Sequence, residues 1–387
     1  MKIMVFLTAA AAFVVSPLFA DATAAREALI KAADRALQTK PVSVMDKKKL
    51  PPSGDKHDYL SQAPYWWPDP SKPDGLPYIR RDGETIPSRS TDDFDRTSIG
   101  RMIGAVSTLG AGFKETGDEK YAEHATKLLR VWFLDPATKM NPNLNYAQGI
   151  PGITEGRGIG IIDTSGLVGV VKACEWLEKS KAFTNADRKG TKDWIGSYLN
   201  WMLTSKNGKE EAAAFNNHGT YYDLQAVTFA LYTGQKEIAQ KIVEEAKVKR
   251  IAKQIEPDGK MPLELARTKA FTYSTGNLRG LLDLADLAQE LSVDLWRFET
   301  SDGRSLRKAL DYLAPYVDAA KKWPHEQIDT GGVTQGMRID LAVMMRRAAI
   351  IFKEPRYEEM LKAVAGPAWE SNRVQLSWPA RRQIVNR

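Results

Sequence analysis

The chain has 387 residues and a mass of 43.1 kDa, with 43% hydrophobic and 27% charged residues, which excludes a disordered, collagen-like or disulfide-scaffold protein. Its 55 Lys and Arg residues outnumber its 48 Asp and Glu residues by seven, and this basic excess suits a polyanion, either nucleic acid or an acidic polysaccharide. Cys174 is the only cysteine and the four His include no close pair, so we expect no disulfide, no metal site and no cofactor.

The first residues have the order of a secretory signal. A short positive start precedes an apolar stretch over 3–15 and then small residues up to Ala20. We predict a signal peptide over 1–20, with cleavage after Ala20 or as late as Ala24. No later segment reaches about 18 apolar residues in a row, so no membrane contact is expected after cleavage. A periplasmic or secreted protein is poorly placed to meet nucleic acid, so an acidic polysaccharide becomes the expected partner.

From Asp95 onward the pattern is that of amphipathic helices. One apolar stripe at helical spacing runs through Tyr121, Ala125, Leu128, Leu129 and Trp132. The segment 334–352 is so apolar that we expect it to be buried on most sides. No sustained alternating run follows Leu76, which argues against a large sheet. We therefore predict an all-α fold, a single domain over 21–387 in which helical hairpins form a toroid or incomplete barrel.

Two long irregular segments, 63–83 and 140–158, interrupt this helical pattern near the N-terminus. The first is rich in aromatic residues and prolines, and the second in asparagines and glycines. Long irregular segments in a compact helical domain usually carry function or wrap the core.

The segment 216–225 opens a helix with an asparagine at its start. At 100° per residue, His218, Tyr222 and Gln225 fall within about 60° of one another, opposite an apolar face. Asn216 or Asn217 can cap the helix, and the free amide donors there favour a bound anion. The alternative interpretation, a capping asparagine followed by a hydrogen-bonded, partly buried histidine, is equally compatible with the pattern.

A second candidate segment is 262–273, which contains Arg267 and, six residues later, Tyr273 at the start of another helix. Its neighbours make that helix apolar on two faces, which is typical of an inner layer. Taken alone, the segment favours a structural interpretation, with Glu264 and Arg267 as a helical ion pair and Tyr273 as a packing aromatic.

Together these segments resemble the alginate lyase superfamily of helical-toroid polysaccharide lyases, in particular family 38 and more distantly family 5. The resemblance extends from about Tyr65 to Arg338. It is carried by the motifs Tyr65-Trp66-Trp67-Pro68, Met140-Asn141-Pro142-Asn143, Gly160-Ile161-Ile162-Asp163, Asn216-Asn217-His218 and Leu263-Glu264-Leu265-Ala266-Arg267, with Tyr273 downstream. One departure concerns Arg267, because family 5 enzymes typically place this arginine seven residues before the catalytic tyrosine, not six.

The resemblance implies an enzyme that cleaves a β-1,4-linked polyuronate, such as alginate, poly-mannuronate or glucuronan, by β-elimination without a metal. It implies Asn217, His218, Arg267 and Tyr273 as the catalytic residues. Donors aimed at the sugar carboxylate make the C5 proton removable, as in an oxyanion hole. The base is either His218 or Tyr273. For Tyr273 this requires a pKa lowered from about 10 to about 7, or roughly 4 kcal/mol of preferential stabilisation of the phenolate.

The same resemblance gives the irregular segments a role in binding sugar rings, hydroxyls and carboxylates. The expected substrate-binding residues are Tyr65, Trp66, Trp67, Arg80, Arg81, Asn145, Tyr146, Gln148, Arg157, Tyr222, Gln225, Trp323 and His325. Aromatic and proline-rich segments also commonly anchor a chain that wraps a toroid, and that interpretation stays open for each of them.

Two alternatives belong to other classes. An inverting glycoside hydrolase needs two carboxyl groups about 6.5–9.5 Å apart, for which Glu155, Asp163 and Glu264 are available. A non-catalytic periplasmic polyuronate-binding protein would bind oligomers without turning them over.

Overall fold

The computed structural model describes residues 22–379, and most of them are helical. The predicted signal peptide over 1–20 lies outside the described residues. The α-helices are α1 (Ala22–Ala36), α2 (Arg96–Thr116), α3 (Glu119–Leu129), α4 (Leu167–Leu177), α5 (Asn185–Thr204), α6 (Lys206–Ala212), α7 (Asn217–Tyr232), α8 (Lys236–Ala246), α9 (Ala252–Gln254), α10 (Pro262–Leu265), α11 (Ala270–Glu290), α12 (Leu306–Leu313), α13 (Gln335–Phe352), α14 (Pro355–Met360), α15 (Pro367–Glu370) and α16 (Val374–Ser377).

Short 3₁₀ and π-helical turns connect these α-helices. The 3₁₀ turns are η1 (Val44–Asp46), η2 (Pro87–Ser90), η4 (Gly158–Thr164), η6 (Ala314–Val317) and η7 (Leu361–Val364). The π-helical turns are η3 (Arg130–Leu134) and η5 (Lys247–Ile251).

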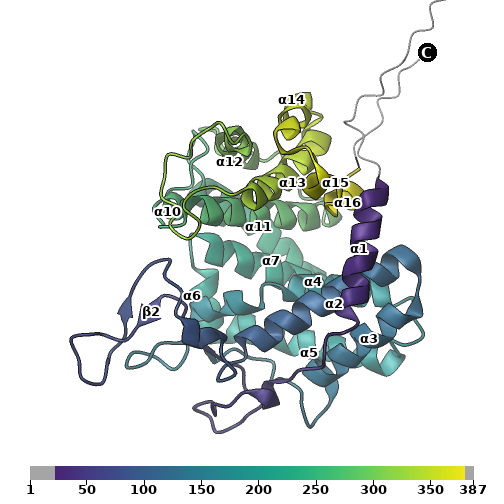
Figure 1. The fold of residues 1–387 in the computed structure, drawn as a ribbon, viewed down its shortest axis with the longest axis vertical. Coiled ribbons are helices and arrows are strands. Elements are labelled where there is room, and N and C mark those ends of the chain that lie inside the picture. The colour runs from purple at the N-terminus through teal and green to yellow at the C-terminus, as the bar shows by residue number, and fades with distance from the viewer. Residues whose placement is uncertain (1–21, 380–387) are drawn as a thin grey trace, which may run out of the picture.

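The helices pack as a curved double layer (Figure 1). An inner series runs α2, α4, α7, α11 and α13, each in contact with the next, and α12 contacts both α11 and α13. The helices α3, α5, α8 and α14 lie outside this series, each against an inner helix. The short C-terminal helices α15 and α16 contact α1, so the two ends of the described chain meet. The predicted all-α toroid is confirmed, with α1 as a helix that the pattern did not predict.

The sequence explains where individual helices form. The stripe predicted on α3 is buried along its whole length, and Asp118 caps the helix by accepting from the Lys120 amide. Thr184 and Asp187 form a capping box at the start of α5. Gly117 ends α2 in the left-handed conformation, with φ of 72°, that glycine adopts without strain. Of the segment 334–352, which we predicted to be buried, the buried residues lie between Leu341 and Ala349 of α13.

The two irregular segments, together with the residues just before the first, form the strands of the described residues. Strand β1 (Leu60–Gln62) pairs in parallel with β4 (Tyr146–Gly149), with a register shift between the two paired positions. Strand β2 (Trp66–Trp67) pairs antiparallel with β3 (Ile79–Arg80) and closes a protruding hairpin (Figure 1). These segments cover the face of the toroid at which α7 and α11 begin, and so they place loop side chains next to the ends of inner helices.

No helix in the part of the chain that the structure describes has both the length and the apolar character to cross a membrane.

Candidate active site

A cleft of about 590 Å³ opens where the irregular segments meet the first turns of α7 and α11. All four predicted catalytic residues line it, together with five of the predicted substrate-binding residues. The lining side chains discussed below are Tyr65, Trp66, Arg80, Arg89, Arg96, Gln148, Arg157, Asp163, Asn217, His218, Tyr221, Arg267 and Tyr273. The cleft therefore brings together residues more than 200 positions apart in the chain.

Asn217 is held at the start of α7 by a buried carboxylate. Asn216 caps the helix by accepting from the His218 amide. Glu264 accepts from the backbone amide of Asn217 at 2.6 Å and from its side-chain Nδ2 at 2.8 Å. Burial raises the pKa of Glu264, while these two hydrogen bonds favour its ionised form. Glu264 thus fixes the Asn217 carboxamide and leaves its second Nδ2 hydrogen for a ligand, and the alternative Glu264–Arg267 pair is wrong.

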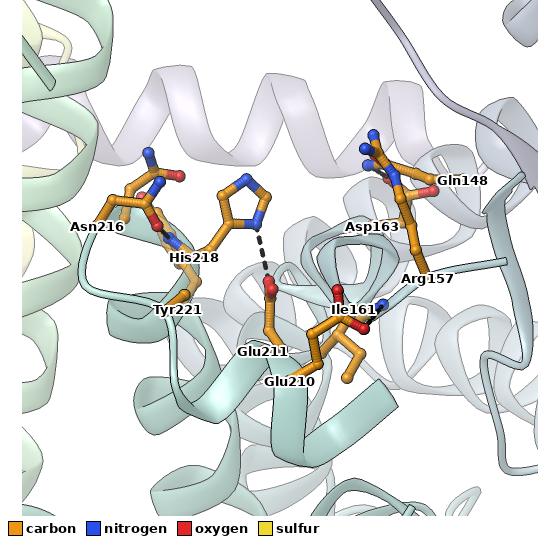
Figure 2. Close-up of polar contacts among 12 residues, drawn as sticks. Gln148, Arg157, Ile161, Asp163, Glu210, Glu211, Asn216, His218 and Tyr221 are labelled. Carbon is orange, nitrogen blue, oxygen red and sulfur yellow. Dashed lines mark hydrogen bonds and ion pairs between the residues drawn. The ribbon is translucent and has the colours of Figure 1, made fainter. Parts of the chain in front are cut away.

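His218 also has a buried carboxylate partner, which the sequence did not reveal. Its Nδ1 lies 2.8 Å from Oε1 of Glu211, a residue at the end of α6 (Figure 2). The Glu211 side chain is only 1% exposed, and burial raises its pKa, with the hydrogen bond from His218 opposing that shift. When Glu211 is ionised, the proton of the imidazole resides on Nδ1, which leaves Nε2 as the atom able to accept a proton in the cleft.

Tyr273 lies on the opposite wall of the cleft, in a series of hydrogen-bonded polar side chains. Its hydroxyl is 2.6 Å from the hydroxyl of Tyr65 and accepts from Nη2 of Arg267 at 2.9 Å. The guanidinium also stacks over the Tyr273 ring, with Cζ 3.8 Å from the ring centroid. Nε and Nη2 of Arg267 both bond to Asp82, so among the described residues Nη1 is the donor nitrogen left free for substrate.

The charges around Tyr273 do not activate it in the substrate-free cleft. Burial raises the pKa of Tyr273 above its usual value, Tyr65 adds to this rise, and the Arg267 charge offsets only part of it. Burial also opposes ionisation of Asp82, but the hydrogen bond and charge of Arg267 outweigh it and lower the pKa of Asp82 to about 2. Asp82 therefore offsets the guanidinium charge that would otherwise lower the pKa of the tyrosine, and Tyr273 starts as a neutral phenol.

A third wall of the cleft is formed by side chains that surround Asp163. Its carboxylate accepts from Tyr59, Ser61 and the Nε2 of Gln148. Gln148 in turn accepts from Nη2 of Arg157 at 2.9 Å, and Figure 2 shows these side chains across the opening from His218. Gln148 has φ of 51°, a conformation that costs free energy outside glycine and is found most often at functional sites.

The lining of the cleft is basic, although Asp82, which pairs with Arg80 and Arg267, offsets part of its charge. Five guanidinium groups line it, and the carboxylate among its lining residues is that of the buried Asp163. Such a concentration of positive charge in a cleft attracts a polyanion and orients its carboxylates. Arg89 and Arg96, which both approach Asp163, were not among the predicted residues, since nothing in their local sequence distinguishes them from surface arginines.

Several predicted substrate-binding residues lie elsewhere. Tyr222 and Gln225 point into the core, where they bond to Met202 and Thr164, respectively. They are buried because α7 is an inner helix covered on all sides, so the side opposite its apolar face is also core. For these two residues the expected substrate contact is wrong in this structure.

The remaining predicted residues lie outside the lining of the cleft for other reasons. Trp323 packs edge-on against Phe271 and Tyr316, and His325 bonds to Tyr312. On the hairpin, Arg81 stacks over the Trp67 ring, whose Nε1 donates to the Glu84 carbonyl. Asn145 and Tyr146 line a separate pocket, together with Glu155.

Within the described residues, no group of three or more His, Cys, Asp or Glu side chains is placed to hold a metal ion. Cys174 is buried.

Comparison with known proteins agrees with this geometry. A family model described as alginate lyase matches residues 43–323. A solved alginate lyase from Bacteroides ovatus is 44% identical over 94% of this chain and 94% of that chain, with a TM-score of 0.87. No curated protein compared with the chain matches it.

More distant solved structures share the fold. Alginate lyase A1-III from Sphingomonas species A1 is 18% identical over 89% of this chain and 92% of its own, with a TM-score of 0.52. A variant of alginate lyase A1-III in complex with a tetrasaccharide is 17% identical over 94% and 97%, with a TM-score of 0.57. The family match over most of the chain and the close relative together show that this chain belongs to the alginate lyase family and is a polysaccharide lyase.

Proposed function

We propose that this protein cleaves alginate, or a related β-1,4-linked polyuronate such as poly-mannuronate or glucuronan, by β-elimination. The observation that carries the proposal is the convergence of Asn217, His218 and Tyr273 in one cleft with five guanidinium groups. The 44% identical relative is named as an alginate lyase, and a distant member of the fold binds a tetrasaccharide.

The reaction depends on the acidity of the C5 proton of the uronate. The proton on C5 of a uronate is removable only when the negative charge of the adjacent carboxylate is neutralised. In the proposed reaction, the free Nδ2 hydrogen of Asn217 and the cleft arginines donate to that carboxylate. Removal of the proton forms the C4–C5 double bond, the bond between C4 and O4 breaks, and O4 takes up a proton as it leaves.

The structure favours His218 as the base and Tyr273 as the acid. Glu211 directs the free Nε2 of His218 toward the cleft, and Tyr273 starts as a neutral phenol that can give its proton to O4. This division suits guluronate, in which the C5 hydrogen and O4 lie on opposite sides of the ring. For mannuronate or glucuronate, Tyr273 can also serve both steps, provided that bound substrate displaces Tyr65 and lowers the phenol pKa.

We also propose that the protein is exported, on the strength of the signal-like segment over 1–20. Sequencing the N-terminus of the protein recovered from the periplasm or medium checks this. A mature chain that starts between residues 21 and 25 is expected, and an intact Met1 in that fraction contradicts it.

The function is tested by following ultraviolet absorbance during digestion of poly-mannuronate, poly-guluronate, glucuronan and a neutral glucan. Elimination creates a conjugated, absorbing 4,5-unsaturated end, whereas hydrolysis creates a reducing end without absorbance. We expect an absorbance rise with at least one polyuronate and none with the glucan. New reducing ends without absorbance would mean a hydrolase, and tight binding without turnover would mean a binding protein.

Tyr273→Phe is expected to lower kcat about 10²- to 10⁴-fold, because it removes the proton donor and keeps the ring. Circular dichroism should remain that of the wild type. Tyr78→Phe is the matched control, since the Tyr78 hydroxyl makes no hydrogen bond in the described part of the structure and lines no part of the cleft. Full activity of the Tyr273 variant would remove Tyr273 from the mechanism.

A further inference from the structure

A second pocket, of about 320 Å³, lies next to the cleft and has no role in the chemistry above. It is lined by Asn145, Tyr146, Thr154, Glu155, Gly156, Ser205, Lys206 and Asn207. Behind the lining, Nε1 of Trp201 donates to Oδ1 of Asn145 at 3.0 Å. This volume is at the lower end of the range of small-molecule sites.

The pocket gathers polar groups without protein partners. The bond from Trp201 orients the Asn145 carboxamide and leaves its Nδ2 free. Among the described residues, no hydrogen bond or ion pair is formed by the Tyr146 hydroxyl, the Lys206 ammonium or the Asn207 carboxamide. Amide donors, a hydroxyl, an ammonium and an aromatic ring around one hollow are the groups that bind an acidic sugar.

The pocket and the catalytic cleft are joined by α6. Lys206 and Asn207 start this helix at the pocket, and Glu211 near its end bonds to His218. Seven residues of α-helix rise about 9 Å, so the pocket is a short distance from the proposed base. The two hollows are also lined by consecutive residues, since Gly156 lines the pocket and Arg157 lines the cleft.

We propose that this pocket binds one further uronate residue of the substrate chain, beyond those held in the cleft. Lys206 binds the carboxylate, Asn145 and Asn207 donate to hydroxyls, and the Tyr146 ring packs against the sugar. Glu155 also lines the pocket and repels a carboxylate, which makes the contact a weak one. The inference rests on the proposed polyuronate lyase function and adds chain-length selectivity to it.

Steady-state kinetics of Lys206→Ala on polyuronate and on the shortest cleavable oligomer test the proposal. For the polymer we expect KM to rise about two- to fivefold with little change in kcat, as for loss of one exposed charge contact. The shortest oligomer cannot span both sites, so its KM should not rise. Glu155→Gln should have the opposite effect and lower KM for the polymer, a change that damage to the fold would not produce.

Lys209→Ala is the matched control, because Lys209 is an exposed lysine on the same helix that lines neither hollow and forms no ion pair with any residue that the structure describes. Equal effects of the two lysine variants, or equal effects on short and long substrates, would overturn the pocket. Failure of the wild-type protein to cleave either substrate would instead overturn the lyase function on which the pocket depends.

Discussion

At the scale of single residues, two buried carboxylates position the catalytic groups. Glu264 fixes Asn217, and Glu211 fixes His218. Neither carboxylate touches the substrate in the proposed reaction. Each acts by determining which atom of its partner is presented to the cleft, so both are positioning residues.

Glu211→Gln should lower kcat roughly 10- to 1000-fold, with a smaller change in KM. The amide keeps the shape of the side chain but not the charge that stabilises the imidazolium formed when His218 takes the proton. Parallel assays of kcat and KM check this. Glu210→Gln is the control, since this neighbouring carboxylate makes only a 3.4 Å contact with the Gly158 amide. Similar losses in both variants would argue against a special role for Glu211.

Asp82→Asn should destabilise the protein by about 1.5–3 kcal/mol at neutral pH, because it weakens hydrogen bonds to a charged partner. The pKa of Asp82 is about 2 in the folded chain, below its model-peptide value near 4, so its stabilisation is present above pH 4 and lost as the pH falls toward 2. Urea unfolding of both proteins from pH 7 downward should show the difference shrinking below pH 4. Asp74→Asn, at an exposed position of the same segment, should show no such trend.

Which residues could be identified from the sequence depends on how local their signals are. Asn217 and His218 belong to one short motif, and the spacing of Arg267 and Tyr273 is short as well. Glu211 could not be told from Glu210, because only the direction of the α6 side chains separates them. The long-range partners Asp82 and Tyr65 required knowledge of which segments meet.

At the scale of elements, the turn before α7 is braced by a fully buried arginine. Arg250 lies in the π-helical turn η5 and makes two bonds to Asp223 on α7. It also donates to the carbonyls of Ala212 and Ala214, which lead into the motif with His218. π-Helical turns are frequently found at functional sites, and here the turn directs Arg250 toward the backbone that carries the proposed base.

Arg250→Met should therefore cost about 3–5 kcal/mol of folding stability, since it leaves the Asp223 carboxylate buried without its partner. Chemical denaturation measures this. Arg279→Met provides the comparison, because its pair with Asp340 is half-exposed and should be worth only about 0–1 kcal/mol. Comparable stability of the two variants would show that the brace is dispensable.

Element-scale prediction from the sequence succeeded where one face of a helix is solvated. The α3 stripe was assigned correctly because its outer face is polar. The positions of Tyr222 and Gln225 were predicted wrongly. Neighbouring helices cover α7 on every side, so its periodicity does not indicate which face is exposed. The η5 turn leaves no sign in the periodicity at all.

At the scale of the whole molecule, the net charge of the chain is modest, and arginine side chains are concentrated at the cleft. Five guanidinium groups face one hollow, so attraction of a polyanion should be long-range and sensitive to salt.

Raising the ionic strength from about 0.1 M to about 1 M shortens the Debye length from about 10 Å to about 3 Å. We expect kcat/KM on polyuronate to fall by about tenfold or more over this range, with kcat at saturation changing much less. A series of rate measurements in NaCl tests this, and a kcat/KM that is independent of salt would exclude electrostatic steering.

The cleft is assembled from distant parts of the chain, and this has a consequence for biosynthesis. Tyr65 meets Tyr273 across 208 positions, and Asp82 meets Arg267 across 185. Contacts of such sequence separation carry a large loop-closure entropy cost, which slows folding. A nascent chain that already includes the histidine motif still lacks its proton donor, Tyr273. The enzyme therefore stays inactive until more than two thirds of it has been translated and the two walls of the cleft have come together.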